Sequence, residues 1–135
     1  MKIKKIIEDE QIIEHCHTGE RLTPSESDLL SALDRLDGMT FSLTLFFIDE
    51  ENFMSIGGGT ENAYIVFVAT EVDQRLSTLV NANLSDTGIR DVVVGGQSGS
   101  YPCNQCVDKH MAKKALLYFA ASGATDPNLS WVHEN

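Results

Sequence analysis

Three apolar segments joined by short turns constrain the fold more than any other feature of this sequence. Residues 41–48 read FSLTLFFI, residues 53–56 read FMSI, and residues 63–70 read AYIVFVAT. Segments this rich in β-branched and aromatic residues are typical of strands. The connections, residues 49–52 and 57–62, are too short for the crossover that parallel neighbours need, so we expect antiparallel pairing. The first segment becomes apolar on both faces, which predicts a central strand.

A first helix is predicted between residues 23 and 38. It begins in the motif TPSE, where Thr23 can cap the helix, Pro24 fits its first position and Glu26 completes a capping box. It extends to about Leu36, and Gly38 ends it. Its apolar stripe consists of Leu29, Leu30, Leu33 and Leu36. A one-sided helix of this kind is typical of a cover over a hydrophobic core.

A second helix is predicted from Asp108 to Gly123. The Asp108 carboxylate can cap the first turn, Val107 can pack back on Ala112, and Gly123 can adopt the left-handed conformation that ends a helix. Its apolar stripe consists of Met111, Ala112, Ala115, Leu116, Phe119 and Ala120. The helix must therefore lie on a sheet, most simply the sheet that contains the strand Val92–Val94.

The remaining segments give weaker signals. Residues 2–14 indicate an edge strand or ribbon, residues 72–80 a strand or one helical turn, and residues 81–88 a polar loop. The pair Gly95-Gly96 permits a bulge or a sharp bend after Val92–Val94. We expect one domain over residues 1–135, of the α+β class, with a mainly antiparallel sheet of about five strands covered by two helices.

The chain is strongly acidic. It has 10 Lys and Arg residues against 20 Asp and Glu residues, a formal net charge of −10. Such a surface repels nucleic acid and anionic membranes and attracts basic proteins, although it can also serve solubility alone. The N-terminal residues MKIKKIIEDEQ lack the apolar core and cleavage site of a signal peptide, so we expect a cytoplasmic protein.

The segment PCNQC, residues 102–106, raises the question of a metal. It forms half of the zinc-deaminase signature, but the other half, H-x-E or C-x-E, does not occur in the sequence. Cys103, Cys106 and His110 have the spacing of a zinc knuckle, with Cys16 or His15 as a possible fourth ligand. A lone C-x-x-C pair is more often structural, so we expect no cofactor, no metal and no enzymatic activity.

The end of the chain has a distinctive order of elements. Val94-Gly95-Gly96-Gln97 is followed by a polar loop, the helix Ala112–Phe119, Gly123 and a lone tryptophan, Trp131. This order resembles the signature of the first-numbered immunity-protein family of bacterial polymorphic-toxin systems. The resemblance extends more faintly to the hairpin Phe53–Thr70, and thus covers about the last two thirds of the chain.

The resemblance implies an antidote that binds a cognate toxin and neutralises it by blocking the active cleft. A toxin that acts on nucleic acid, such as a deaminase or nuclease, needs a basic channel, and the acidic charge of this chain agrees with such a partner. The alternative is a zinc-binding module or metal-dependent enzyme built around Cys103, Cys106, His110 and His17.

Two surfaces are the candidates for toxin binding. The first consists of acidic residues on the two reversals that flank Phe53–Ile56, which we expect to gather at one end of the sheet: Asp49, Glu50, Glu51 and Glu61. The second is the loop 97–105, with Ser98, Ser100 and Tyr101 as its contact residues. Phe119 and Trp131 are instead assigned to the core.

Overall fold

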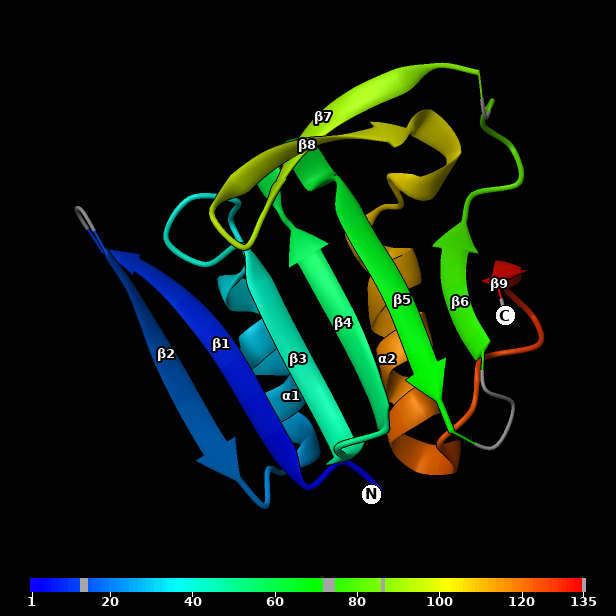
Figure 1. Ribbon diagram of the computed structural model, residues 1–135. Coiled ribbons are helices and arrows are strands. Elements are labelled where there is room, and N and C mark those ends of the chain that lie inside the picture. The colour runs from blue at the N-terminus through cyan, green and yellow to red at the C-terminus, as the bar shows by residue number, and fades with distance from the viewer. Residues whose placement is uncertain (13–14, 72–74, 86, 135) are drawn as a thin grey trace.

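The computed structural model describes residues 1–12, 15–71, 75–85 and 87–134. Over these residues, seven strands form one antiparallel sheet in the order β2-β1-β3-β4-β5-β6-β9, and β7 and β8 form a second sheet (Figure 1). The strands are β1 (Lys5–Ile12), β2 (His15–Leu22), β3 (Leu43–Asp49), β4 (Asn52–Gly58), β5 (Tyr64–Thr70), β6 (Arg75–Val80), β7 (Ile89–Val94), β8 (Gln97–Pro102) and β9 (Ser130–Glu134). The helices are α1 (Glu26–Arg35) and α2 (Lys109–Ser122), and 3₁₀ turns occupy Thr60–Asn62 and Cys103–Gln105. The α+β class is confirmed, but the expectation of about five strands is wrong.

The three apolar segments form neighbouring antiparallel strands, as predicted, and they lie in the middle of the main sheet. Strand β3 pairs with β4, and β4 pairs with β5, in both cases antiparallel and through short turns. Alternate side chains on these strands are fully buried, among them Phe46, Met54 and Val66. Because side chains alternate across a strand, these residues define one buried face of the sheet.

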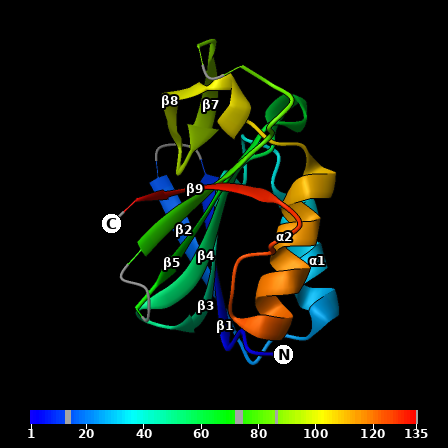
Figure 2. The ribbon, with the colours of Figure 1, turned by 90° about the vertical axis from the view of Figure 1, so that its right-hand side faces the viewer.

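Both helices cover this buried face (Figure 2). The largest core cluster joins side chains from both helices to side chains from five strands and the N-terminal segment: Ile3, Ile6, Leu29, Ala32, Leu33, Leu36, Phe46, Met54, Ile56, Tyr64, Val66, Val68, Leu79, Val107, Ala112, Ala115, Leu116, Phe119 and Ala120. Apolar burial on this scale is the main favourable term in folding, so the layer of sheet and helices forms the stable body of the molecule.

The second helix has the predicted caps, whereas the first begins later than expected. Asp108 accepts from the Met111 amide at 2.8 Å, and Gly123 ends α2 with a φ of 75°. In α1 the N-cap is Ser25, which forms a capping box with Asp28. Thr23 does not fill this role because its φ is 46°, outside the extended conformation that an N-cap needs.

The end of α1 also differs from the prediction. The helix ends at Arg35, with Leu36 as the C-cap residue. Gly38 lies in the following turn with a φ of 75°, where a Cβ atom would meet the Thr60 hydroxyl. Gly38 therefore allows the turn after the helix and does not itself end the helix.

The N-terminal strand is not an edge strand. β1 lies between β2 and β3, and the edge position belongs to β2, which the sequence did not predict. Seven of the eight residues of β2 are exposed, so this strand has no buried face that would require an apolar alternation in its sequence, HCHTGERL. The predicted range 2–14 ends in residues 13 and 14, which lie outside the described residues.

Strand β6 pairs with β9, which places the last residues of the chain in the main sheet. Of the two structures considered for residues 72–80, the strand is found over Arg75–Val80, and residues 72–74 lie outside the described residues. Trp131 is directly opposite Leu79 and packs against the main core, as expected for a core residue. Its indole nitrogen donates to the Asp126 carbonyl oxygen at 3.0 Å, which ties β9 to the segment that follows α2.

Strand β7, which contains Val92–Val94, does not belong to the sheet that α2 covers. It pairs with β8 (Gln97–Pro102), so most of the loop expected over residues 97–105 is a strand. Gly95 and Gly96 form the hairpin turn with φ values of 64° and 80°, which confirms the sharp bend.

Within the described residues, neither the length nor the apolar character of any helix suffices to span a membrane.

The packing of α2 predicts a large effect of truncating Phe119. Its side chain is 0% exposed in the main core, so Phe119→Ala should lower the free energy of unfolding by about 3–5 kcal/mol. The exposed residue Lys114 on the same helix provides the control, because Lys114→Ala should change it by less than about 0.5 kcal/mol. Chemical denaturation measures both. Equal stability of the two variants would contradict the assignment of Phe119 to the core.

Candidate protein-binding surface

The face of the main sheet opposite the helices carries a second set of apolar side chains. Directly paired residues on neighbouring strands point to the same face, so the strand register defines this set. One row across the sheet is Leu22, Lys5, Phe47, Phe53, Ala69 and Leu76. The next row is Glu20, Ile7, Leu45, Ser55, Phe67, Thr78 and Val132. We call the surface formed by these two rows the open face, because both helices lie on the other side (Figure 2).

Three phenylalanines form the centre of the open face. The Phe47 and Phe53 rings lie 5.2 Å apart, and the Phe53 and Phe67 rings lie 6.2 Å apart in an edge-to-face arrangement. All three are partly exposed, and we call them the aromatic strip. Leu76 is 48% exposed and Val132 43% exposed at the β6–β9 side of the same face. Contiguous apolar surface of this kind is typical of an interaction site.

Acidic side chains gather at one end of the open face. Asp49, Glu50 and Glu51 lie in and beside the β3–β4 turn, and Glu71 follows β5 at the same end of the sheet. The Asn52 amide donates to the Asp49 carboxylate and lowers the pKa of Asp49. A hydrogen bond with Glu51 and the repulsion of its charge raise the pKa of Glu71. We call Asp49, Glu50, Glu51 and Glu71 the acidic end.

Glu61 lies at the opposite end of the sheet from the other predicted acidic residues. It sits in the β4–β5 connection, whereas Glu50 and Glu51 sit in the β3–β4 connection, and these two reversals lie at opposite ends of β4. Glu61 also forms an ion pair with Arg90 at 3.4 Å. The expectation that all four residues share one end of the sheet is therefore wrong, and Glu71 takes the place of Glu61.

The β7–β8 hairpin lies over the other end of the open face (Figure 1). A Cβ atom on Gly57 would lie 2.6 Å from Val94, so this glycine permits the close approach of the hairpin to β4. Tyr101 packs against the small apolar cluster beneath the hairpin. Ser98 is exposed, and the exposed Ser100 donates to the Asp91 carboxylate at 2.8 Å. The three predicted residues thus lie on one strand, β8, away from the acidic end.

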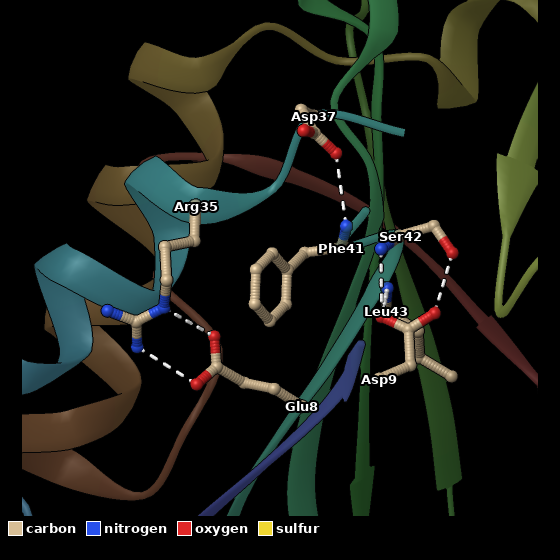
Figure 3. A network of polar contacts seen from close by, with 7 residues as sticks. All are labelled: Glu8, Asp9, Arg35, Asp37, Phe41, Ser42 and Leu43. Carbon is tan, nitrogen blue, oxygen red and sulfur yellow. Dashed lines mark hydrogen bonds and ion pairs between the residues drawn. The ribbon is translucent and has the colours of Figure 1, made fainter. Parts of the chain in front are cut away.

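A buried carboxylate attaches this hairpin to the main sheet. Asp9 accepts from the Ser42 amide at 2.8 Å, from the Ser42 hydroxyl at 2.7 Å and from the Leu43 amide at 2.7 Å (Figure 3). The Ser42 hydroxyl in turn accepts from the Gly96 amide at 2.8 Å. Asp9, Ser42 and Gly96 therefore form a continuous chain from β1 through the start of β3 to the hairpin turn.

A second carboxylate of β1, that of Glu8, attaches helix α1 to the main sheet. Glu8 points to the helical side and accepts two hydrogen bonds from Arg35 of α1, at 2.8 and 2.9 Å (Figure 3). Such a bidentate pair fixes both distance and orientation. Neighbouring residues of β1 thus position α1 on one face and the hairpin on the other.

Comparison with known proteins decides the family. The model of the family described as Immunity protein Imm1 matches residues 17–133. The chain belongs to this family. The match includes β3, β4 and β5, the β7–β8 hairpin and α2, and with them nearly all of the open face. No curated protein and no solved structure matches the chain significantly.

The residues of the metal hypothesis lie in different environments in this Imm1 chain. Cys106 is buried, and burial raises the pKa of its thiol, which opposes the thiolate form that binds zinc. Cys103 is partly buried, His110 is exposed on α2, and Cys16 is exposed on the edge strand β2. Among the described residues, no group of three or more His, Cys, Asp or Glu side chains is placed to hold a metal ion.

A cavity of this Imm1 chain is lined by a serine and a histidine that the sequence patterns did not indicate. It has a volume of about 280 Å³ and lies between the ends of β4, β5, β6 and β9 and the residues after α2. The Ser77 hydroxyl lies 2.6 Å from His133 Nδ1. These residues are directly opposite each other on β6 and β9, so the register of the sheet accounts for their contact. Within the described part of the chain, no hydrogen bond joins His133 to a carboxylate, as a catalytic triad would require.

The role of Asp9 can be tested by replacing it with asparagine. Asp9→Asn puts an amide in a site where four donors converge, from Ser42, Leu43 and Gln11, so it should lower the free energy of unfolding by about 1–3 kcal/mol. It should also increase hydrogen exchange at the Gly96 amide. Glu10→Gln, on the next residue of β1, is the control and should leave this exchange unchanged. Unaltered protection of Gly96 in Asp9→Asn would contradict the attachment of the hairpin through Ser42.

Proposed function

We propose that this chain is an immunity protein that binds a cognate bacterial toxin domain and neutralises it by blocking the active cleft. Membership of the immunity family over residues 17–133 is the observation that carries this proposal. The role is that of an inhibitor that acts by binding, without catalysis and without a cofactor.

The charge of the chain supports a toxin that acts on nucleic acid, such as a deaminase or a nuclease. The formal net charge of −10 gives long-range attraction to a protein with a basic substrate channel. A channel that holds phosphates must be basic, so an acidic inhibitor can occupy it in place of the substrate. The same charge repels nucleic acid and anionic membranes from the inhibitor itself.

The acidic end is the first candidate for contact with such a channel. Glu50 and Glu51 project from a turn and are exposed, so a partner can reach them without rearrangement of the sheet. The hairpin residues Ser98, Ser100 and Tyr101 form the second candidate. Glu61, paired with Arg90, belongs with the hairpin end of the surface.

The proposal is tested with the toxin domain encoded by the neighbouring gene. The purified chain should bind this domain and abolish its activity at a stoichiometric ratio, and co-expression should restore growth of cells that produce the toxin. A toxin that stays fully active in the presence of excess immunity protein would overturn the proposal.

Charge reversal at the acidic end should slow association with the toxin. In the double variant Glu50→Lys, Glu51→Lys, we expect an association rate at least about tenfold lower at low salt and a weaker dependence on salt, because rim charges act mainly on encounter. Stopped-flow kinetics at several salt concentrations measures both effects.

The double variant Glu26→Lys, Asp34→Lys is the matched control for net charge. Both residues are exposed on α1, on the helical side of the molecule, and the change in formal charge is the same. Because Asp34 forms an ion pair with Lys109 of α2, the melting temperature of this variant is measured as well. An equal loss of association rate in the two double variants would show that only net charge matters and would move the contact away from the acidic end.

The raised pKa of Glu71 predicts that toxin binding is linked to protons. A basic partner favours the charged carboxylate, so binding should release protons and the affinity should fall as the pH falls through the raised pKa of Glu71. Calorimetry in buffers of different ionisation enthalpy measures this release. Glu71→Gln should remove that part of the pH dependence. A pH dependence that persists unchanged in Glu71→Gln would place the linked group elsewhere.

A further inference from the structure

We infer that the open face is the apolar centre of the toxin interface, and that it receives a folded toxin surface whose apolar side chains are bordered by lysines and arginines. This inference rests on the function proposed above. It goes further because it names the face that binds and the chemistry of the surface that binds to it.

The exposure of the aromatic strip is the first observation. Phe47, Phe53 and Phe67 lie on three adjacent central strands and are partly exposed to solvent, and the Phe53 ring packs against the other two. Leu76 and Val132 extend this apolar surface toward β9, each more than 40% exposed. Burial of such a surface by a partner is strongly favourable, and aromatic side chains dominate the energetics of interfaces.

The borders of the open face give it a defined extent. The β7–β8 hairpin lies over one end, held by the Asp9, Ser42 and Gly96 contacts, and the acidic end closes the other. Glu20 on β2 lies at one side, in the second row, and Glu134 on β9 lies at the other side, where it pairs with Leu76 of the first row. The surface is thus an apolar floor with carboxylates on three sides, which matches the general anatomy of an interface with an apolar core and a polar rim.

The charge of this rim decides between possible occupants. In a symmetric pair of two copies, the same patch meets itself, so carboxylates of one copy would approach carboxylates of the other. The net charge of −10 adds to this repulsion. Lys5, a cation within the rows, already lies 3.4 Å from Glu50 and 4.8 Å from the centre of the Phe47 ring. The rim therefore favours a partner that supplies positive charge around an apolar centre.

The acidic end and the aromatic strip should act on different rate constants. Exposed rim charges accelerate encounter, whereas buried aromatic residues at the centre of an interface determine how long the complex lasts. Loss of a central aromatic side chain should therefore increase the dissociation rate and leave the association rate nearly unchanged. A purely structural role of these phenylalanines would not produce this division.

The experiment measures binding kinetics on the immobilised toxin domain encoded by the neighbouring gene. Phe53→Ala and Phe67→Ala should each weaken binding by about 30-fold or more through faster dissociation, with association rates within about threefold of wild type. Leu76→Ser tests the same face at a residue that is half exposed, where the substitution disturbs folding little. Leu117→Ala is the control, because Leu117 is a partly buried apolar residue of α2 on the helical side. Melting temperatures of all variants confirm that they are folded.

The outcomes separate this inference from the proposed function. If wild type does not bind the toxin domain, the proposed function fails and the inference fails with it. If wild type binds and the Phe53, Phe67 and Leu76 variants bind equally well, the function stands and the open face is not the interface. Sedimentation of the free protein provides the last test, because a wild-type dimer that Phe53→Ala dissociates would assign the face to a second copy and overturn the inference.

Discussion

The packing of both helices against one face of the sheet is the constraint on which the rest of this structure depends. Phe46, Val66 and Leu79 point into this layer and meet Leu33 and Phe119 from the helices. Because side chains alternate along a strand, burial of these residues forces their neighbours Phe47, Phe67 and Val80 to the other side. The aromatic strip is thus a direct consequence of how the core is packed. Both helices lie on the opposite face of the main sheet and do not cover the strip.

The β7–β8 hairpin lies over one end of the open face without extending the main sheet, and specific small and polar residues account for this. Gly57 leaves the space that Val94 occupies above β4, and the Asp9 carboxylate fixes the Ser42 hydroxyl that receives the Gly96 amide. The hairpin covers one end of the face through a small apolar cluster around Ile65 and Val92. The remaining part of the face, from the aromatic strip to the acidic end, stays accessible to solvent.

Local signals in the sequence predicted the centre of the fold, whereas pairings between distant segments were not predictable. Short turns and apolar alternation identified β3, β4 and β5, and the caps at Asp108 and Gly123 placed α2. Strand β2 is polar on both sides, and β9 pairs with β6 about fifty residues earlier in the chain, so neither leaves a local pattern. Their places depend on contacts that form only in the complete sheet.

The candidate site shows the same division between local and distant information. The exposed turn with Glu50 and Glu51 was recognisable from its composition, but the approach of Glu71 to Glu51 depends on the β4–β5 register. The placement of Glu61 was wrong for a topological reason, since two consecutive reversals always lie at opposite ends of the strand they share. The open face itself could not be predicted, because alternation separates two sets of side chains without indicating which set the helices cover.

The edges of the sheet are less suited to a specific partner than its face. Seven of the eight residues of the edge strand β2 are exposed and most are polar, and β9 is a strand of five residues that carries Glu134. Exposed charged residues and short edge strands oppose the addition of another strand. Strand addition also relies on backbone hydrogen bonds, which discriminate poorly between partners, whereas an antidote must distinguish its own toxin from others.

Side chains on the open face can supply that discrimination between partners. Because alternation separates the two sets of side chains, the aromatic strip and the acidic end can be substituted while Phe46, Phe119 and the rest of the buried layer stay as they are, which is the property that the proposed toxin interface requires.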